Sequence, residues 1–241
     1  MAELLVVVPT YNERESLPGV IARIRAAVPR ADVLIVDDNS PDGTGALADS
    51  LSDEQVAVLH RPGKDGLGRA YLAGFEHAMR GGYSYVAEID ADGSHDPAEL
   101  PTMLALAAHG ADLVIGSRWV DGGAVRNWPW LRQAISRAGN GYSRVMLRSR
   151  IHDITAGFRV FRTAALQSLQ LDSVSSQGYC FQVEMAWRLE RSGAVVVEHP
   201  ITFVERAQGR SKMHLGIVTE ALLRVTGWGL TAGLPRRSTR A

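Results

Sequence analysis

Apolar runs alternate with helical patterns of polar and apolar positions along the first 117 residues of this chain. The runs are rich in Val, Ile and Leu, as in strands buried on both faces of a sheet, and they fall at residues 4–8, 33–36, 56–59, 85–87 and 112–116. The helical patterns include one that begins after Ser16, a predicted N-cap, and one over residues 67–79. Strands that alternate with helices predict an α/β fold with a mainly parallel sheet flanked by helices.

Beyond residue 117 the pattern is less regular but still predicts several elements. A helix is expected over residues 132–148, with a less polar face formed by Ile135, Gly139, Tyr142 and Met146. Short strands are expected at 195–197 and 202–204. A last helix over 215–228 has one side formed by Leu215, Val218, Leu222 and Val225. This helix either packs on the sheet or belongs to a membrane-facing surface.

Polar side chains gather where three of the predicted strands end. Tyr11 and Glu13 follow the first strand, Asp37, Asp38 and Asp42 follow the second, and Asp90 and Asp92 follow the fourth. Because the carboxyl ends of parallel strands open on one side of the sheet, we expect these groups to share a crevice. A ring and carboxylates there would suit a nucleobase and a ribose. For Asp37, Asp38 and Asp42 the alternative is a purely structural role in a turn.

Asp90 and Asp92 are two residues apart at a strand end, so an extended backbone turns both carboxylates to the same side. Two adjacent carboxylates repel each other unless a cation lies between them, and oxygen ligands suit Mg²⁺ or Mn²⁺. The pair therefore predicts a divalent metal held against a phosphate-bearing ligand. The alternative is a helix start capped by Ser94 or Asp96, and Asp96 is expected to cap in either case.

Two familiar nucleotide-binding patterns are absent from the sequence. A dinucleotide dehydrogenase needs Gly-x-Gly-x-x-Gly after its first strand, where this chain has residues 9–13, PTYNE. A P-loop kinase needs Gly-x-x-x-x-Gly-Lys-Ser/Thr, which does not occur. Both classes are excluded.

Charge divides the chain into an acidic and a basic half. Residues 1–117 carry 8 Lys/Arg and 18 Asp/Glu, and residues 118–241 carry 18 and 8, so the net charge changes from −10 to +10. This split suggests an acidic part that holds a cation and a basic part that meets phosphates; two independently solvated surfaces would give the same numbers. Eight arginines of the segment 118–160 are interleaved with Trp119, Trp128 and Trp130. We expect this segment to meet a membrane-borne phosphate rather than nucleic acid, which the acidic half would repel.

Cysteine content and hydropathy indicate where in the cell the protein is expected. Cys180 is the only cysteine, which excludes a disulfide framework and is typical of a reducing compartment. No run reaches the about 18 uninterrupted apolar residues of a transmembrane helix, and the first apolar run is too short for a signal peptide. We expect a cytoplasmic protein that is peripheral on the cytoplasmic face of a membrane.

Taken together, the motifs resemble family-two glycosyltransferases, in particular those that make dolichyl- or polyprenyl-phosphate mannose. The resemblance covers nearly the whole chain and rests on VPTYNE at 8–13, VDDNSPDGT at 36–44, GKDGLG at 63–68, DAD at 90–92, GSR at 116–118, SR at 136–137 and SK at 211–212. It implies a GT-A fold, a GDP-mannose donor, a polyprenyl or dolichyl phosphate acceptor and a Mg²⁺ or Mn²⁺ cofactor. It also implies a catalytic domain over 1–212, in which 118–160 faces the acceptor, and an amphipathic helix with a basic tail over 213–241.

The resemblance also assigns roles to residues. The nucleotide-sugar would contact Pro9, Tyr11, Glu13, Asp38, Asp90, Arg206 and Lys212. The metal would be held by Asp90, Asp92 and Ser94. The acceptor phosphate would contact Arg118, Arg132, Ser136 and Arg137, and the catalytic set would be Asp92, Arg118 and Arg132. Two positions depart from the family pattern: Ser94 stands where many relatives have a glutamine ligand, and Gln177 where a lysine is frequent.

The expected reaction is an inverting transfer of mannose to the lipid phosphate. A phosphate monoester with a second pKa of roughly 6 is largely ionised at neutral pH, so it needs no general base. Alternatives from the sequence are a UDP-glucose donor, a hydroxyl acceptor, or a non-catalytic sugar-nucleotide-binding membrane adaptor.

Overall fold

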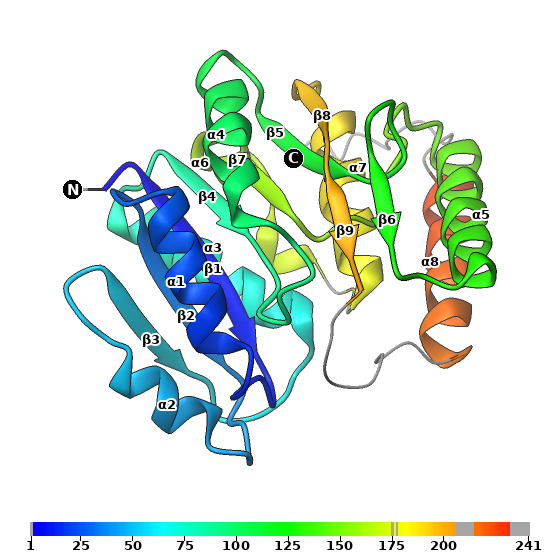
Figure 1. Cartoon of the computed structure of the whole chain (residues 1–241). Helices are drawn as coiled ribbons and strands as arrows, with labels where there is room; N and C mark the ends of the chain where they lie inside the picture. Colours follow the sequence, from blue (N-terminus) through cyan, green and yellow to red (C-terminus); the bar gives the residue numbers. More distant parts are fainter. Residues whose placement is uncertain (1, 175, 177, 206–214, 232–241) are drawn as a thin grey trace.

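The computed structural model describes residues 2–174, 176, 178–205 and 215–231, without the side chains of Tyr179 and of residues 215–218. A seven-stranded sheet with the order β3-β2-β1-β4-β7-β5-β8 lies at its centre (Figure 1). Its strands are β1 (Leu4–Thr10), β2 (Asp32–Asp37), β3 (Val56–His60), β4 (Tyr85–Glu88), β5 (Leu113–Ser117), β7 (Arg159–Arg162) and β8 (Val196–Pro200). All neighbours are parallel except β7, which is antiparallel to β4 and β5. The prediction of a mainly parallel α/β sheet is confirmed.

Helices cover both faces of this sheet. They are α1 (Leu17–Ala27), α2 (Thr44–Ser50), α3 (Leu67–Gly81), α4 (Leu100–Ala108), α5 (Trp130–Leu147), α6 (Thr163–Gln167), α7 (Tyr179–Arg191) and α8 (Leu215–Thr231), with short 3₁₀ helices at Pro97–Glu99 and Leu171–Ser173. A second, two-stranded parallel sheet pairs β6 (Ala124–Arg126) with β9 (Thr202–Val204).

The continuous apolar strands are buried on both faces, as their composition predicts. Val6 and Val8 of β1 belong to a core with residues of α1 and α4, whereas Leu5 and Val7 belong to a core with residues of α3 and α7. Each such fully buried side chain stabilises the fold by about 1.5–3 kcal/mol. Helix α3 approaches the sheet closely because position 74 is glycine: a Cβ there would lie 2.5 Å from a methyl group of Val7.

The predicted helix caps have different outcomes. Asp96 caps the 3₁₀ helix before α4, where its Oδ1 accepts a hydrogen bond from Ala98 N at 3.1 Å, as predicted. Ser16 occupies the N-cap position of α1, but its hydroxyl donates to Glu13 O at 3.2 Å and caps no helical amide. The predicted N-cap position of Ser16 is therefore confirmed, but its side chain makes no capping hydrogen bond.

Helix α8 packs chiefly on other helices, and its Val225 is buried in the core on one face of the sheet. It contacts α5 and α7. Tyr142 of α5 and Thr226 of α8 share a hydrogen bond of 2.5 Å, and Trp187 of α7 stacks on Trp228 with ring centres 5.6 Å apart. Helices α5 and α8 thus form a layer at one edge of the molecule (Figure 1). Within the described part of the chain, no helix is long and apolar enough to cross a membrane.

Candidate active site

A cavity of about 200 Å³ lies where the carboxyl ends of the central strands meet the α5–α8 layer. Its lining combines two kinds of side chain. The charged and polar members include Asp90, Asp92, His95, Arg118, Arg132, Ser136 and Gln182. The apolar members include Ile135, Val183, Ala221, Leu222 and Val225, from α5, α7 and α8. Leu222 and Val225, predicted to share one side of α8, both face this cavity.

The turn after β4 presents the two predicted metal carboxylates. Gly93 has a φ of 76°, a left-handed conformation that permits the chain to turn directly after Asp92. Asp92 Oδ1 accepts hydrogen bonds from Ser94 N at 3.0 Å and from Ser94 Oγ at 2.6 Å, while Tyr71 donates to Asp90 Oδ1 at 3.4 Å. The Ser94 hydroxyl therefore orients Asp92, and its role as a metal ligand stays a prediction.

The donor set suits a metal that shares its coordination with a ligand. Among the described residues, no three His, Cys, Asp or Glu side chains converge in a closed metal cage. Asp90 and Asp92 both line the cavity, so their oxygens face a space that a ligand can enter. Mg²⁺ typically binds through one or two carboxylates, water and substrate phosphates, and this arrangement fits that pattern.

Hydrogen bonds join the ends of β1 and β2 and shape the turn after β2, on the nucleotide side of the predicted site. Asp37 Oδ1 accepts from Thr10 Oγ1 at 2.8 Å and from Ser40 Oγ at 2.6 Å. Asp42 Oδ1 accepts from Thr44 N at 2.9 Å. The carboxylates of Asp37 and Asp42 therefore have the turn-forming role that the sequence left open for them.

Asp38 and Tyr11 differ from these turn residues, because each contacts the charged group of a basic side chain. Asp38 is buried and forms an ion pair with Arg61; burial raises its pKa, against the opposing effect of Arg61. The ammonium group of Lys64 lies 4.0 Å from the centre of the Tyr11 ring. Pro9, Tyr11, Glu13 and Asp38 stand at adjacent strand ends but do not line the 200 Å³ cavity. Their nucleotide-binding role stays a prediction.

Arg118 is held by a buried carboxylate that the sequence did not identify. Asp153 Oδ2 accepts from Arg118 N at 2.9 Å and Nε at 2.7 Å, and its Oδ1 accepts from Nη2 at 2.6 Å. Thr155 Oγ1 accepts a further bond from Nη2 at 3.0 Å. Asp153 has no exposed surface and Arg118 is 8% exposed, so the pair fixes the guanidinium in one orientation at the cavity wall.

Arg132 and Arg118 contact the same aromatic ring, that of Trp128. The Arg132 guanidinium is 4.3 Å from the ring centre of Trp128 and forms an ion pair with Glu205. The Arg118 guanidinium is 5.4 Å from the same Trp128 ring. Trp128 thus contacts two guanidinium groups at the cavity wall, each of which is also paired with a carboxylate.

The structure places only one of the two remaining predicted acceptor residues at the cavity. Ser136 lines the cavity, whereas Arg137 does not and instead lies 4.7 Å over the ring of Trp119. Of the three tryptophans expected at a membrane interface, Trp119 and Trp128 are half-buried around Arg118, and Trp130 is 77% exposed. The rings of Trp119 and Trp128 pack against arginines, and a membrane-interface role for the three tryptophans stays a prediction.

His95 forms part of the cavity floor and is uncharged at neutral pH. Its ring packs against Phe158 and Phe203, with ring centres 5.3 and 5.1 Å away, and its Nδ1 is 3.9 Å from Asp90 Oδ2. Burial lowers the pKa of His95 to about 4. A neutral imidazole there adds no positive charge beside Asp90.

Glu88 provides a pH-dependent stability prediction. It is fully buried opposite Arg159, and burial raises its pKa from 4.5 to about 8, despite the opposing effect of Arg159. The folded state thus binds this proton more tightly than the unfolded chain, so the contribution of Glu88 to stability is fully present below about pH 4.5 and is lost by about 1 kcal/mol per pH unit as the pH rises towards 8. In urea unfolding, the free energy of unfolding of Glu88→Gln relative to that of the parent chain should rise as the pH rises over this range. Parallel pH dependences of the two proteins would contradict the prediction.

Several predicted residues lie outside the described part of the chain. These are Arg206, Lys212, Gln177 and the basic tail at 235–240. The sequence, in turn, gave no role to Asp153, Thr155, His95, Gln182 or Glu205. Asp153 lies 35 residues from Arg118 along the sequence, and only the folded chain brings the two together.

Comparison with known proteins identifies similar chains along almost the whole length. The sequence profile described as Glycosyl transferase family 2 matches residues 5–170. The chain is 52% identical over 235 residues to a polyprenol monophosphomannose synthase from Mycolicibacterium smegmatis, covering 96% of this chain and 89% of that protein. It is 54% identical over 231 residues to an undecaprenyl-phosphate mannosyltransferase from Micrococcus luteus, covering 95% of each.

Solved structures share the fold at low sequence identity. A glucosyl-3-phosphoglycerate synthase from Mycobacterium tuberculosis, solved with Mn²⁺, UDP-glucose and phosphoglyceric acid, has a TM-score of 0.68 at 19% identity, covering 98% of this chain and 81% of that one. A mannosyltransferase from Pyrobaculum calidifontis, solved with GDP-mannose and Mn²⁺, has a TM-score of 0.59 at 18% identity, covering 87% and 58%. These likenesses confirm the predicted GT-A type fold.

Proposed function

Because the chain belongs to glycosyl transferase family 2, we propose that it transfers a mannosyl group from GDP-mannose to a polyprenyl or dolichyl phosphate. The observation that carries this proposal is the mixed lining of the active-site cavity. Two carboxylates and two arginines line the cavity together with apolar side chains from α5, α7 and α8. A lipid phosphate presents the same combination of a charged head and an apolar tail. The similarity to a polyprenol monophosphomannose synthase and to an undecaprenyl-phosphate mannosyltransferase supports this assignment.

The two arginines are the acceptor-phosphate residues of this reaction. Arg118 and Arg132 place two guanidinium groups at one end of the cavity, and Asp153 and Trp128 fix their orientations. Charge-assisted hydrogen bonds to phosphate are about twice as strong as neutral ones. Ser136 on the same wall adds a hydroxyl donor.

The acceptor attacks without help from a base. A phosphate monoester with a second pKa of roughly 6 already carries the negative oxygen that attacks the anomeric carbon. As the new carbon–oxygen bond forms, the bond to the GDP oxygen breaks and its electron pair leaves with GDP. One displacement inverts the anomeric centre, so an α-linked donor gives a β-linked mannosyl phosphate lipid.

Asp90 and Asp92 are the residues that would hold a divalent metal on the donor diphosphate. Mg²⁺ or Mn²⁺ there would neutralise the charge that develops on the leaving GDP. The hydrogen bonds from Ser94 hold Asp92 in place for this contact. Pro9, Tyr11, Glu13 and Asp38, at the ends of β1 and β2, would receive the nucleoside, and Arg206 and Lys212 would contact the donor phosphates.

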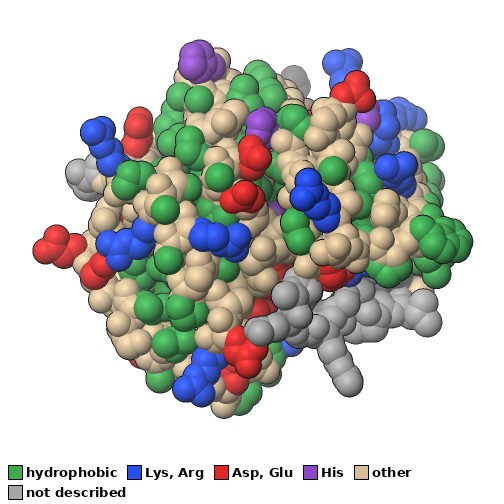
Figure 2. Space-filling model, viewed as in Figure 1, with side chains coloured by type: hydrophobic (Ala, Val, Ile, Leu, Met, Phe, Trp, Pro, Cys, Tyr) green, Lys and Arg blue, Asp and Glu red, His purple; other side chains and the backbone are tan. Residues whose placement is uncertain are grey.

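The α5–α8 layer is the surface that would lie on the membrane. Exposed large apolar side chains gather on these two helices: Trp130, Leu131, Ile135 and Val145 of α5, and Leu222, Leu223 and Leu230 of α8. Figure 2 shows hydrophobic side chains at the edge where Figure 1 places α5, with basic side chains next to them. Tryptophan and arginine at such a surface suit a headgroup region. The protein would then be peripheral on the cytoplasmic face, with 1–212 as its catalytic domain and 213–241 as an added membrane contact.

A donor comparison tests the proposed function. Labelled GDP-mannose, UDP-glucose and UDP-GlcNAc would each be offered with polyprenyl phosphate, and the lipid phase extracted and counted. We expect label in the lipid phase chiefly from GDP-mannose. Transfer mainly from UDP-glucose would favour the glucosyl alternative, and nucleotide binding without any transfer would favour a non-catalytic adaptor.

A further inference from the structure

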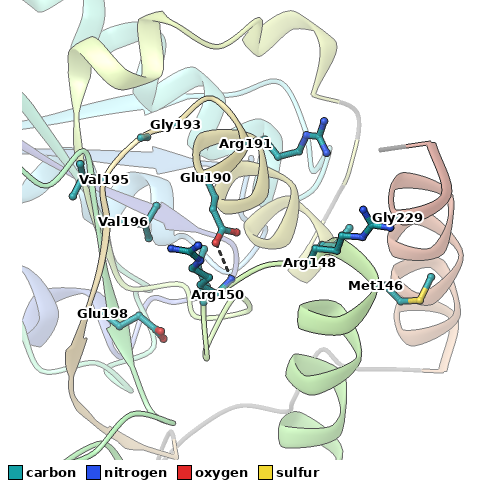
Figure 3. A pocket seen from close by; sticks show the side chains of 13 residues that line it. Met146, Arg148, Arg150, Glu190, Arg191, Gly193, Val195, Val196, Glu198 and Gly229 are labelled. Carbon is teal, nitrogen blue, oxygen red and sulfur yellow. Dashed lines mark hydrogen bonds between the residues drawn. The ribbon is translucent and has the colours of Figure 1, made fainter. Parts of the chain in front are cut away.

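A second cavity, of about 600 Å³, lies beyond the C-terminal end of α5, between β8, α7 and α8 (Figure 3). In the described part of the chain it shares no lining residue with the active-site cavity. Its volume is in the range of sites that bind small molecules, roughly 300–1,000 Å³. The reaction proposed above makes no use of it.

The two carboxylates of this cavity are already engaged by the backbone. Glu198 accepts hydrogen bonds from His152 N at 2.7 Å and from Asp153 N at 2.9 Å. Glu190 Oε1 accepts from Arg150 N at 2.7 Å, the bond drawn in Figure 3. These glutamates therefore anchor the segment after α5 to α7 and β8.

Two arginines of the cavity, Arg148 and Arg150, are not paired with carboxylates in this way among the described residues. Both arginines are exposed. Arg191 lies on a third side, 5.4 Å over the ring of Trp187. Arg148 closes α5 in a left-handed conformation, with φ 53° and ψ 37°, where glycine would be less strained. Guanidinium groups are well suited to phosphate oxygens.

Apolar walls and a neighbouring apolar surface complete the cavity. Val195 and Val196 lie on one side of the two arginines in Figure 3, and Met146 and Gly229 lie on the other. Helices α5 and α8 touch here, since a Cβ at position 229 would lie 2.5 Å from Met146 O. Leu230, next to Gly229, is one of the exposed apolar side chains of the α5–α8 layer.

We propose that this cavity is a second phosphate site, which binds the headgroup of an anionic membrane lipid through Arg148 and Arg150. The guanidinium groups of Arg148 and Arg150 would bind the phosphate ester. Because the adjoining α5–α8 layer would lie on the membrane, the cavity would be at the level of the lipid headgroups. The proposal rests on the proposed function only for the orientation of that layer. A soluble phosphate ester has the same head chemistry and is separated from the lipid by the experiment.

Vesicle sedimentation of the full chain tests this site. The vesicles would be phosphatidylcholine, with and without about one-fifth phosphatidylglycerol. We expect the double variant Arg148→Gln/Arg150→Gln to bind anionic vesicles at least about tenfold more weakly, because two charge-assisted contacts are lost. Arg30→Gln/Arg80→Gln changes the charge equally near the ends of α1 and α3, away from α5 and α8 (Figure 1), and should have less than a twofold effect. An equal loss of binding to anionic vesicles in both double variants, or no loss in either, would overturn the proposal.

Two further arms define the ligand and separate this site from the proposed function. Trp130→Ser/Leu223→Ser should weaken binding to both kinds of vesicle, since it removes apolar contact rather than charge. Glycerol phosphate would also be added as a competitor. If it releases the parent chain from anionic vesicles but does not change the binding of Arg148→Gln/Arg150→Gln, the site recognises the phosphate ester itself. If it does not release the parent chain, the site requires the lipid. Transfer in detergent should stay within twofold for that double variant. A parent chain that transfers nothing, yet keeps the arginine-dependent binding, would refute the proposed function and leave this site standing.

Discussion

Asp92→Ala should lower the rate of mannosyl transfer on the order of 10³-fold or more while the chain still folds. The carboxylate is one of two that would hold the metal on the donor diphosphate, and losing it removes several kcal/mol of transition-state stabilisation. Asp92 is only partly buried, and its Oδ1 accepts hydrogen bonds from the backbone and hydroxyl of Ser94. Initial rates and Mn²⁺ titration, together with thermal unfolding, would separate the catalytic loss from a folding defect.

Asp96→Ala is the matched control for this experiment. Asp96 lies four residues further along the same turn, and its carboxylate caps the 3₁₀ helix through Ala98 N. Its loss should destabilise the fold by about 1 kcal/mol but leave metal dependence unchanged. If the parent chain turned over at a near-normal rate in excess EDTA, the metal assignment would be wrong.

Arg118→Met should have two effects, a loss of stability and a loss of acceptor binding. It leaves the Asp153 carboxylate buried without its partner, which destabilises a protein by about 3–5 kcal/mol. It also removes a phosphate contact of about 1.5–3 kcal/mol, so the KM for polyprenyl phosphate should rise more than that for GDP-mannose.

A second substitution at Asp153 distinguishes these two effects. In Arg118→Met/Asp153→Leu no unpaired charge stays buried, so a large part of the stability should return while transfer stays impaired. Arg132→Met is the comparison, because its partner Glu205 is less buried and its removal should affect the acceptor KM more than stability. Denaturant unfolding and substrate titrations measure both quantities. Weakened nucleotide binding alone in the Arg118 and Arg132 variants would place the acceptor elsewhere.

The elements that the sequence predicted best are those whose local pattern agrees with their final surroundings. The apolar run at 4–8 becomes β1 because it is buried on both faces, and helix α3 at Leu67–Gly81 follows its predicted period. Strand β7 was not predicted, because it begins and ends with arginine. Arg159 is nevertheless fully buried: its side chain donates to Ala156 O, Gln182 O and Ile154 O, each at 2.8 Å. Local composition cannot reveal such distant partners.

The same limit applies to the candidate site. Adjacent carboxylates such as Asp90 and Asp92 are visible in a linear motif, and the structure places both at the cavity. The contacts that orient Arg118 come from Asp153 and Trp128, and only tertiary structure joins them. Likewise, the apolar face of α8 was visible, but its packing on α5 and α7 was not.

The configuration of the lipid product tests the central claim most directly. The purified chain would be incubated with GDP-mannose, polyprenyl phosphate and Mg²⁺ or Mn²⁺, and the extracted lipid examined by NMR beside a measurement of released GDP. We expect a β-linked mannosyl phosphate lipid, one GDP released for each lipid formed, and neither product in excess EDTA. An α-linked product, or GDP released with free mannose instead of a mannosyl lipid, would contradict direct displacement by the lipid phosphate.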